Sequence, residues 1–191
     1  MGAIRVGPPE HVVFALRDAL GARAFIETGT NNGNTAAWAA EHFEHVYTSE
    51  AATVLATAAQ ERFKGNAKVR VFSTTSAHML RTLYGGVENP GPAVLWLDAH
   101  WCGEGTSRVG GECPLTDELK ALPQNGRYAV IIDDARLFLR PPPPPHDPDE
   151  WPHIGTVGAG LAALGLCVYE YQDTLIGVPY TLRKALREAI K

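Results

Sequence analysis

The sequence lacks long apolar runs, has few cysteines and carries no excess of positive charge. No window approaches the roughly 20 apolar residues of a membrane-spanning helix, and the first residues, MGAIRVGPPEHVVF, hold no apolar stretch of signal-peptide length. The three cysteines, Cys102, Cys113 and Cys167, are too few and too unevenly spaced for a disulfide framework. We therefore expect a cytoplasmic protein with no membrane partner.

The charge balance gives no basic surface for nucleic acid. The formal net charge is -4, and 45% of the residues are hydrophobic, which is ordinary for a globular protein. A chain of 191 residues is long enough to bury a core and has the length of one domain. We expect a single domain over 1–191 that binds a small molecule and no nucleic acid; a homodimer is left open.

Helix-like and strand-like segments alternate along the chain, without a repeat or a long linker. The expected helices are 9–20 (within an N-terminal helical segment 1–22), 34–43, 51–63, 77–84, 114–122, 154–164 and a tail helix; the expected strands are 22–28, 45–50, 68–73, 93–100, 128–135, 166–173 and 174–179. This alternation predicts an α/β fold with a doubly wound, Rossmann-like, seven-stranded and mostly parallel sheet, covered by helices on both faces. The last two strands, which turn at Asp173, predict a C-terminal antiparallel hairpin.

A glycine turn follows the first expected strand, in the stretch FIETGTNNGNTA, residues 25–36. In open parallel sheets, ligands bind beyond the carboxyl ends of the strands, where such a turn lies. The spacing is Gly29-x-x-x-Gly33, and Asn31 stands where a dinucleotide fingerprint needs its second glycine. A pyrophosphate would also meet the negative charge of Glu27. The turn therefore favours a ligand with a positively charged end and disfavours a dinucleotide.

Glu50 ends the second expected strand 21 residues after Gly29, where an acidic side chain accepts hydrogen bonds from ribose hydroxyls. FIETGTNNGNTA followed by VYTSE resembles the nucleotide-binding half of class I S-adenosylmethionine (SAM)-dependent methyltransferases. The resemblance implies SAM as cofactor, with contacts from Glu27, Thr28, Gly29, Asn31, Gly33, Thr35, Glu50, Thr75, Ser76 and Asp98. Many relatives have an acidic residue after the third strand, where this chain has Thr75 and Ser76, so the adenine contact is left open. The alternatives are helix-capping or ion-pairing roles for Glu27 and Glu50 and an N-cap role for Ser76.

Acidic residues close the two most apolar strands. Asp98 follows AVLWL, and Asp133 and Asp134 follow YAVII, so all three should converge on one rim of the sheet. The pair WLDAH and VIIDDAR resembles the metal-dependent O-methyltransferases, which implies a Mg²⁺ ion, or another divalent cation, held by these three residues. The alternative is that Asp98 contacts the methionine part of SAM and that an aspartate of the pair caps a loop.

The loops 101–113 and 140–153 are expected to form the active site. His100 is the candidate general base and Asp98 the second catalytic residue, although a loop histidine is often a plain hydrogen-bonding group. Substrate-pocket candidates are Trp101, His146 and Trp151. The proline run 141–145 is expected to be an extended polyproline segment, either a pocket wall or a rigid spacer.

The function expected from these observations is SAM-dependent methylation of a small-molecule acceptor, with oxygen as the acceptor atom and with or without a divalent metal. One alternative is an NAD(P)-dependent oxidoreductase of the Rossmann type. The other is a non-catalytic cofactor-binding protein that uses its proline run as a partner motif.

Overall fold

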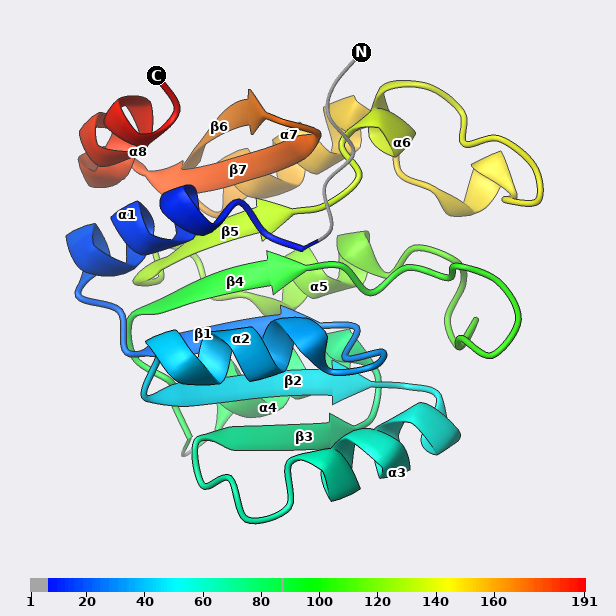
Figure 1. The fold of residues 1–191 in the computed structure, drawn as a ribbon. Coiled ribbons are helices and arrows are strands. Elements are labelled where there is room, and N and C mark those ends of the chain that lie inside the picture. The colour runs from blue at the N-terminus through cyan, green and yellow to red at the C-terminus, as the bar shows by residue number, and fades with distance from the viewer. Residues whose placement is uncertain (1–6, 87) are drawn as a thin grey trace.

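The computed structural model describes residues 7–86 and 88–191, and within them seven strands form one sheet in the order β3-β2-β1-β4-β5-β7-β6 (Figure 1). The strands are β1 (Ala24–Thr28), β2 (His45–Glu50), β3 (Val69–Ser73), β4 (Ala93–Leu97), β5 (Tyr128–Ile132), β6 (Leu166–Tyr171) and β7 (Thr174–Pro179). Strands β1 to β5 are parallel, and β7 runs antiparallel to both β5 and β6. The predicted mostly parallel sheet with its C-terminal hairpin is confirmed.

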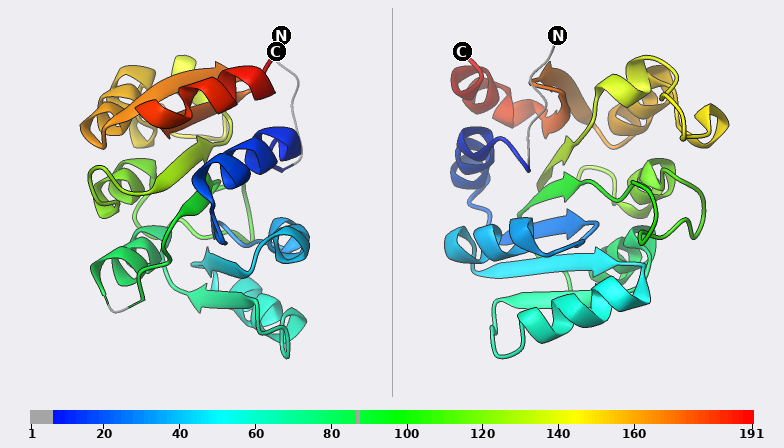
Figure 2. Two further views of the ribbon diagram at one scale, coloured as in Figure 1. Left: turned by 90° about the vertical axis from the view of Figure 1, so that its left-hand side faces the viewer. Right: turned by 45° about the vertical axis from the view of Figure 1, so that its right-hand side comes forward.

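Helices cover both faces of this sheet (Figure 2). They are α1 (Glu10–Leu20), α2 (Asn34–His42), α3 (Thr53–Arg62), α4 (Ser76–Gly85), α5 (Leu115–Ala121), α6 (Arg136–Leu139), α7 (Ile154–Ala163) and α8 (Arg183–Ala189). Successive residues of a strand point to opposite faces, so β4 sends Val94 and Trp96 into a core with α1, α2 and α8, and Leu95 into a core with α4, α5 and α7. None of the helices in the described part of the chain is long and apolar enough to cross a membrane.

The strand register brings the predicted site to one level of the sheet. Thr28 at the end of β1 pairs with Leu97 at the end of β4, and Leu97 pairs with Ile132 at the end of β5. Every residue of these three strands is buried, as expected for central strands covered on both faces. The residues that follow them therefore leave the sheet side by side, on the rim where parallel sheets bind ligands.

The structure differs from the sequence expectations mainly where elements end. Strands β4 and β5 end before their aspartates, and the short helix α6 after β5 was not expected. The run 141–145 is not extended throughout, because the chain turns at its end and the amide of His146 donates to the carbonyl of Pro143 at 3.2 Å. Of the expected N-terminal segment 1–22, helix α1 is observed, whereas residues 1–6 lie outside the described residues.

The C-terminal hairpin turns where the sequence predicted. Gln172 and Asp173 both have positive φ angles, 48° and 66°, as a tight two-residue turn requires. The main-chain carbonyl of Asp173 accepts a hydrogen bond from Ala135 at 2.8 Å, and its side chain accepts one from the amide of Arg136 at 2.9 Å. The hairpin thus fixes the start of α6 beside the rim of the sheet.

Candidate active site

A cavity opens beyond the carboxyl ends of β1, β2 and β4. Its wall includes six of the predicted cofactor residues, namely Gly29, Asn31, Glu50, Thr75, Ser76 and Asp98. The rest of the wall is formed by Ser49, Ala51, Ala99, His100, Cys102, Thr106, Ser107, Val109, Gly111 and Pro114. The structure therefore brings the glycine turn, the end of β2, the start of α4 and the loop 101–113 around one space.

The glycine turn lies close against the end of β4. Gly29 has a φ of 85°, and a Cβ atom at this position would lie 2.7 Å from the carbonyl oxygen of Asp98. The amides of Gly29 and Thr30 both donate to the carbonyl of Ser49 at 3.0 Å. Gly33, at φ 75°, leaves room for the ring of Phe63, which a Cβ would approach to 2.8 Å. Glycine is needed at both positions for backbone conformation and for space.

Glu50 is buried and holds the turn by both of its carboxylate oxygens. Oε2 accepts the amide of Asn31, and Oε1 accepts the amide of Ala52, each at 2.9 Å. The same side chain also lines the cavity. A carboxylate fixed by two backbone amides has a set direction and still has lone pairs for ligand hydroxyls.

Glu27 lies beneath the turn, only 2% exposed, and accepts a hydrogen bond from the hydroxyl of Thr48 at 2.7 Å. Burial raises its pKa to about 8, and the charges of Asp98 and Glu50 add to this, whereas the hydroxyls of Thr48 and Thr35 oppose it. The neighbouring Thr28 is fully buried and accepts the amide of Asp98 at 3.1 Å. Glu27 does not line the cavity, so it influences a ligand there through its charge and not by direct contact.

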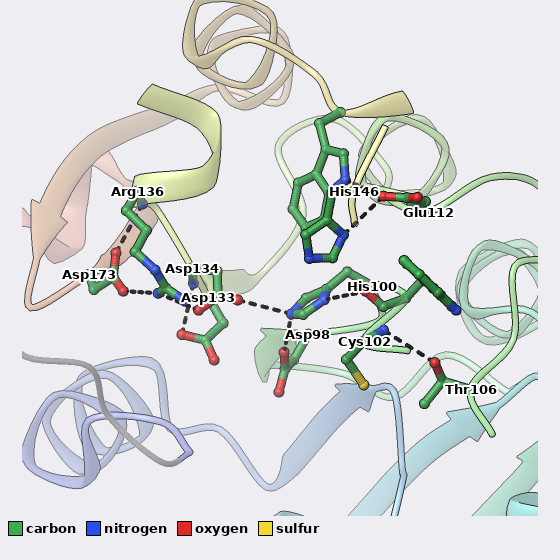
Figure 3. Close-up of polar contacts among 12 residues, drawn as sticks. Asp98, His100, Cys102, Thr106, Glu112, Asp133, Asp134, Arg136, His146 and Asp173 are labelled. Carbon is green, nitrogen blue, oxygen red and sulfur yellow. Dashed lines mark hydrogen bonds and ion pairs between the residues drawn. The ribbon is translucent and has the colours of Figure 1, made fainter. Parts of the chain in front are cut away.

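His100 lies between two carboxylates of the rim (Figure 3). Its Nε2 is 3.1 Å from Asp134 Oδ2 and 3.4 Å from Asp98 Oδ1, and its Nδ1 is 3.3 Å from the carbonyl of Trp101. Burial alone would lower the pKa of His100, but hydrogen bonds and charges from Asp134 and Asp98 raise it to about 11. The ring is therefore protonated at neutral pH, with both nitrogens acting as donors. A protonated ring has no lone pair to accept a proton, so this arrangement favours a hydrogen-bond donor, and the general-base role of His100 stays a prediction.

The predicted metal ligands face cations that belong to the chain itself. Asp134 bonds Arg136 Nη1 at 2.6 Å as well as His100, and Arg136 also pairs with Asp173 (Figure 3). Across residues 7–86 and 88–191, no group of three or more His, Cys, Asp or Glu side chains is arranged to hold an ion. Asp98, Asp133 and Asp134 accordingly do not fit a divalent metal here. A histidine and an arginine already neutralise Asp98 and Asp134.

Asp133 differs from Asp98 and Asp134 in its partner: its carboxylate accepts a hydrogen bond from the backbone amide of Asp134 at 2.8 Å. Burial raises its pKa to about 7, and the charges of Asp98 and Asp134 add to the shift. A carboxylate with a pKa near the working pH can take up a proton. Asp133 lines a small pocket beside the cavity, together with Asp98 and His100.

Glu112, which the sequence did not single out, joins the two expected active-site loops. It is fully buried, and its carboxylate accepts hydrogen bonds from Trp151 Nε1 at 2.9 Å and from the amide of Asp147 at 3.2 Å. It also pairs with His146 Nδ1 at 3.0 Å and with Arg108 Nη2 at 2.9 Å. Burial opposes ionisation, but these donors hold the pKa of Glu112 below its ordinary value. The local sequence, a glycine-rich loop, does not indicate that Glu112 is buried or that it accepts hydrogen bonds from a distant loop.

The predicted substrate-pocket residues come together as one aromatic cluster. The ring of His146 lies 5.6 Å from Trp101 and 5.3 Å from Trp151, and the ring of Trp151 lies 5.4 Å from His100. Trp151 is buried and belongs to the core beneath the loops. It supports the wall of the site from behind, whereas Trp101 remains partly exposed.

A second carboxylate that the sequence did not single out lies behind the cavity. Glu118 on α5 is buried, and its Oε1 has no hydrogen-bond partner among the described residues. Burial raises its pKa to about 7, while polar contacts with Ser76 and Thr28 oppose the shift. Ser76 therefore serves a buried glutamate as well as the cavity wall.

No protein-family model matches the sequence, and no curated protein matches it either. Among solved structures, the O-methyltransferase TomG from Streptomyces achromogenes, in complex with SAM, aligns with a TM-score of 0.56 at 19% identity, over 92% of this chain and 82% of that one. The chain has the class I methyltransferase fold.

Two further methyltransferase structures align with this chain over most of its length. The O-methyltransferase from Bacillus cereus, in complex with S-adenosylhomocysteine (SAH), aligns with a TM-score of 0.55 at 18% identity, over 92% of this chain and 82% of that one. The sugar N-methyltransferase KedS8 from a Streptoalloteichus species aligns with a TM-score of 0.55 at 14% identity, over 89% and 85%. At such identities the methyltransferase fold is shared, and the chemistry must be argued from the residues of this chain.

Proposed function

We propose that this protein is a SAM-dependent methyltransferase that acts on a small-molecule acceptor through oxygen. The observation that carries the proposal is the cavity wall in which the Gly29 turn, Glu50 and Asp98 meet. The turn brings backbone close to a ligand, and Glu50 offers a fixed carboxylate to ribose hydroxyls. Glu27, buried beneath the turn with a raised pKa, can ionise when a cationic group approaches, which favours a ligand with a positively charged amino acid end.

In methyl transfer the protein mainly orients two reactants for a single displacement. When bound, SAM supplies an electrophilic methyl group on its sulfonium. Asp98, on the cavity wall, would orient the amino acid end of the cofactor. Asp133 lines a small neighbouring pocket that shares Asp98 and His100 with the cavity, and it is the candidate acceptor for the proton of a hydroxyl substrate. The proposal uses no metal step, because His100 and Arg136 already neutralise the rim carboxylates.

Two features count against the dinucleotide alternative. Asn31 stands in place of the glycine that lets a pyrophosphate approach, and its amide is already bonded to Glu50. The sheet also inserts antiparallel β7 between β5 and β6, whereas the dinucleotide-binding sheet has the order 3-2-1-4-5-6.

The test is isothermal titration calorimetry of the purified protein with SAH and, separately, with NADH. We expect saturable binding of SAH and none of NADH. The variant Glu50→Ala should lose SAH binding, whereas Glu41→Gln, at an exposed position on α2, should keep it. Binding of NADH without SAH would refute the proposal and favour the oxidoreductase.

A further inference from the structure

The loops 101–113 and 140–153 contact each other through two glutamates, one from each loop, that accept hydrogen bonds from the opposite loop. Glu112 of the first loop accepts hydrogen bonds from the second loop, and Glu150 of the second loop accepts the amide of Glu112 at 2.7 Å. Arg108 bonds both glutamates, at 2.9 Å to Glu112 and 3.3 Å to Glu150. Each loop thus satisfies buried or half-buried donors of the other, so the two are expected to move as one unit.

The bond from Trp151 to Glu112 sets the orientation of a buried ring. An indole has a single N–H donor, and here it meets a carboxylate that is fully buried. Hydrogen bonds to an ionised acceptor are about twice as strong as neutral ones. Glu112 is therefore the group that decides how Trp151 is rotated within the core.

Trp151 carries this constraint to the rim of the sheet. One side of its ring system packs against Phe138 at 5.8 Å, and the His100 ring lies 5.4 Å away at an interplanar angle of 50°. His100 must keep one orientation to reach Asp134 and Asp98 with a single nitrogen. A Trp151 ring that is held in one orientation therefore restricts the orientations open to the His100 ring.

We propose that Glu112 is a positioning residue: it fixes the Trp151 ring and, through that ring, the orientation of His100 at the cavity. The inference rests on the proposed function only in taking this cavity as the cofactor site. Neither Glu112 nor Trp151 lines the cavity, so the effect is indirect.

The experiment follows the ring N–H protons of His100 by NMR in protein labelled with ¹⁵N-histidine, with and without SAH. His100→Gln identifies the signals by their loss. Glu112→Gln removes the charge, and Trp151→Phe keeps an aromatic ring beside His100 but removes the indole donor. Glu104→Gln is the matched control, because Glu104 is an exposed glutamate of the same loop.

Wild type and Glu104→Gln should show slowly exchanging His100 ring protons. In Glu112→Gln and Trp151→Phe, these protons should exchange with water at least about tenfold faster, as expected when one hydrogen bond to a charged group is lost. Circular dichroism verifies the fold, and if Glu112→Gln does not fold, Trp151→Phe decides. Unchanged His100 exchange in every folded variant would overturn the inference. Failure of wild type to bind SAH would instead count against the proposed function, whatever the NMR result.

Discussion

Replacing Glu27 by glutamine should stabilise the ligand-free protein near neutral pH and weaken its binding of SAH. The folded state raises the pKa of Glu27 from 4.5 to about 8. Below pH 4.5 the carboxyl is protonated in both the folded and the unfolded chain, so it imposes no cost. Between pH 4.5 and 8 only the unfolded chain releases the proton, so stability falls as the pH rises, and above pH 8 the full cost is present.

At 1.36 kcal/mol per pH unit, this cost is about 1 kcal/mol at pH 5 and about 3 kcal/mol at pH 7. Glutamine is uncharged and can still accept from Thr48, so the Glu27→Gln variant should avoid most of that cost. Urea unfolding of both proteins at pH 5 and pH 7 measures the difference. The exposed control Glu41→Gln should match wild type at both pH values.

Glu27→Gln should stabilise the ligand-free protein but should weaken its affinity for SAH. A cationic amino acid end in the cavity should lower the pKa of Glu27, so wild type should release part of a proton when it binds SAH at pH 7. Calorimetry in buffers of different ionisation enthalpy measures that release, which Glu27→Gln should lack. The reasoning is refuted if the variant is less stable than wild type at both pH values, or if the difference does not grow with pH.

Three more outcomes test the site. Gly29→Ala should lower the free energy of unfolding by about 1–3 kcal/mol more than Gly65→Ala does. Both glycines have a φ of 85°, but only at Gly29 would a Cβ atom lie against backbone. Equal urea midpoints for the two variants would contradict the clash. Glu50→Gln should cost about 1–3 kcal/mol of stability, because an amide nitrogen cannot accept one of the two backbone donors, and it should weaken SAH binding in calorimetry. Addition of EDTA should leave SAH affinity and the melting temperature unchanged, and a rise in melting temperature on adding MgCl₂ would show that the rim does bind an ion.

The sequence predicts the frame of the site well because that frame is local. Short apolar runs such as AVLWL and YAVII are typical of buried strands, and parallel pairing then brings Asp98 and Asp133 to the same rim. Glu50 follows from its place at the end of a strand. In each case one stretch of chain and one rule of sheet geometry suffice.

The contacts between loops could not be predicted in the same way. Glu112 meets Trp151 across 39 positions of sequence, through a loop whose glycines allow many paths. Nothing in the local sequence shows that two aspartates, which follow different strands, both contact Nε2 of His100. Its protonation state depends on those tertiary neighbours, which raise the pKa of the ring and favour a donor role.

The charges of the site favour one kind of ligand. Asp98 and Asp134 are compensated by His100, and Glu112 is compensated by Arg108. The neighbours that oppose the raised pKa of Glu27 are hydroxyls, and two further carboxylates raise it. A buried carboxyl of this kind is protonated while the cavity is empty and ionises when a cation approaches. The turn therefore favours a positively charged ligand, which the ionised carboxylate of Glu27 would attract. A phosphate would keep the Glu27 carboxyl neutral and would have no attraction to it.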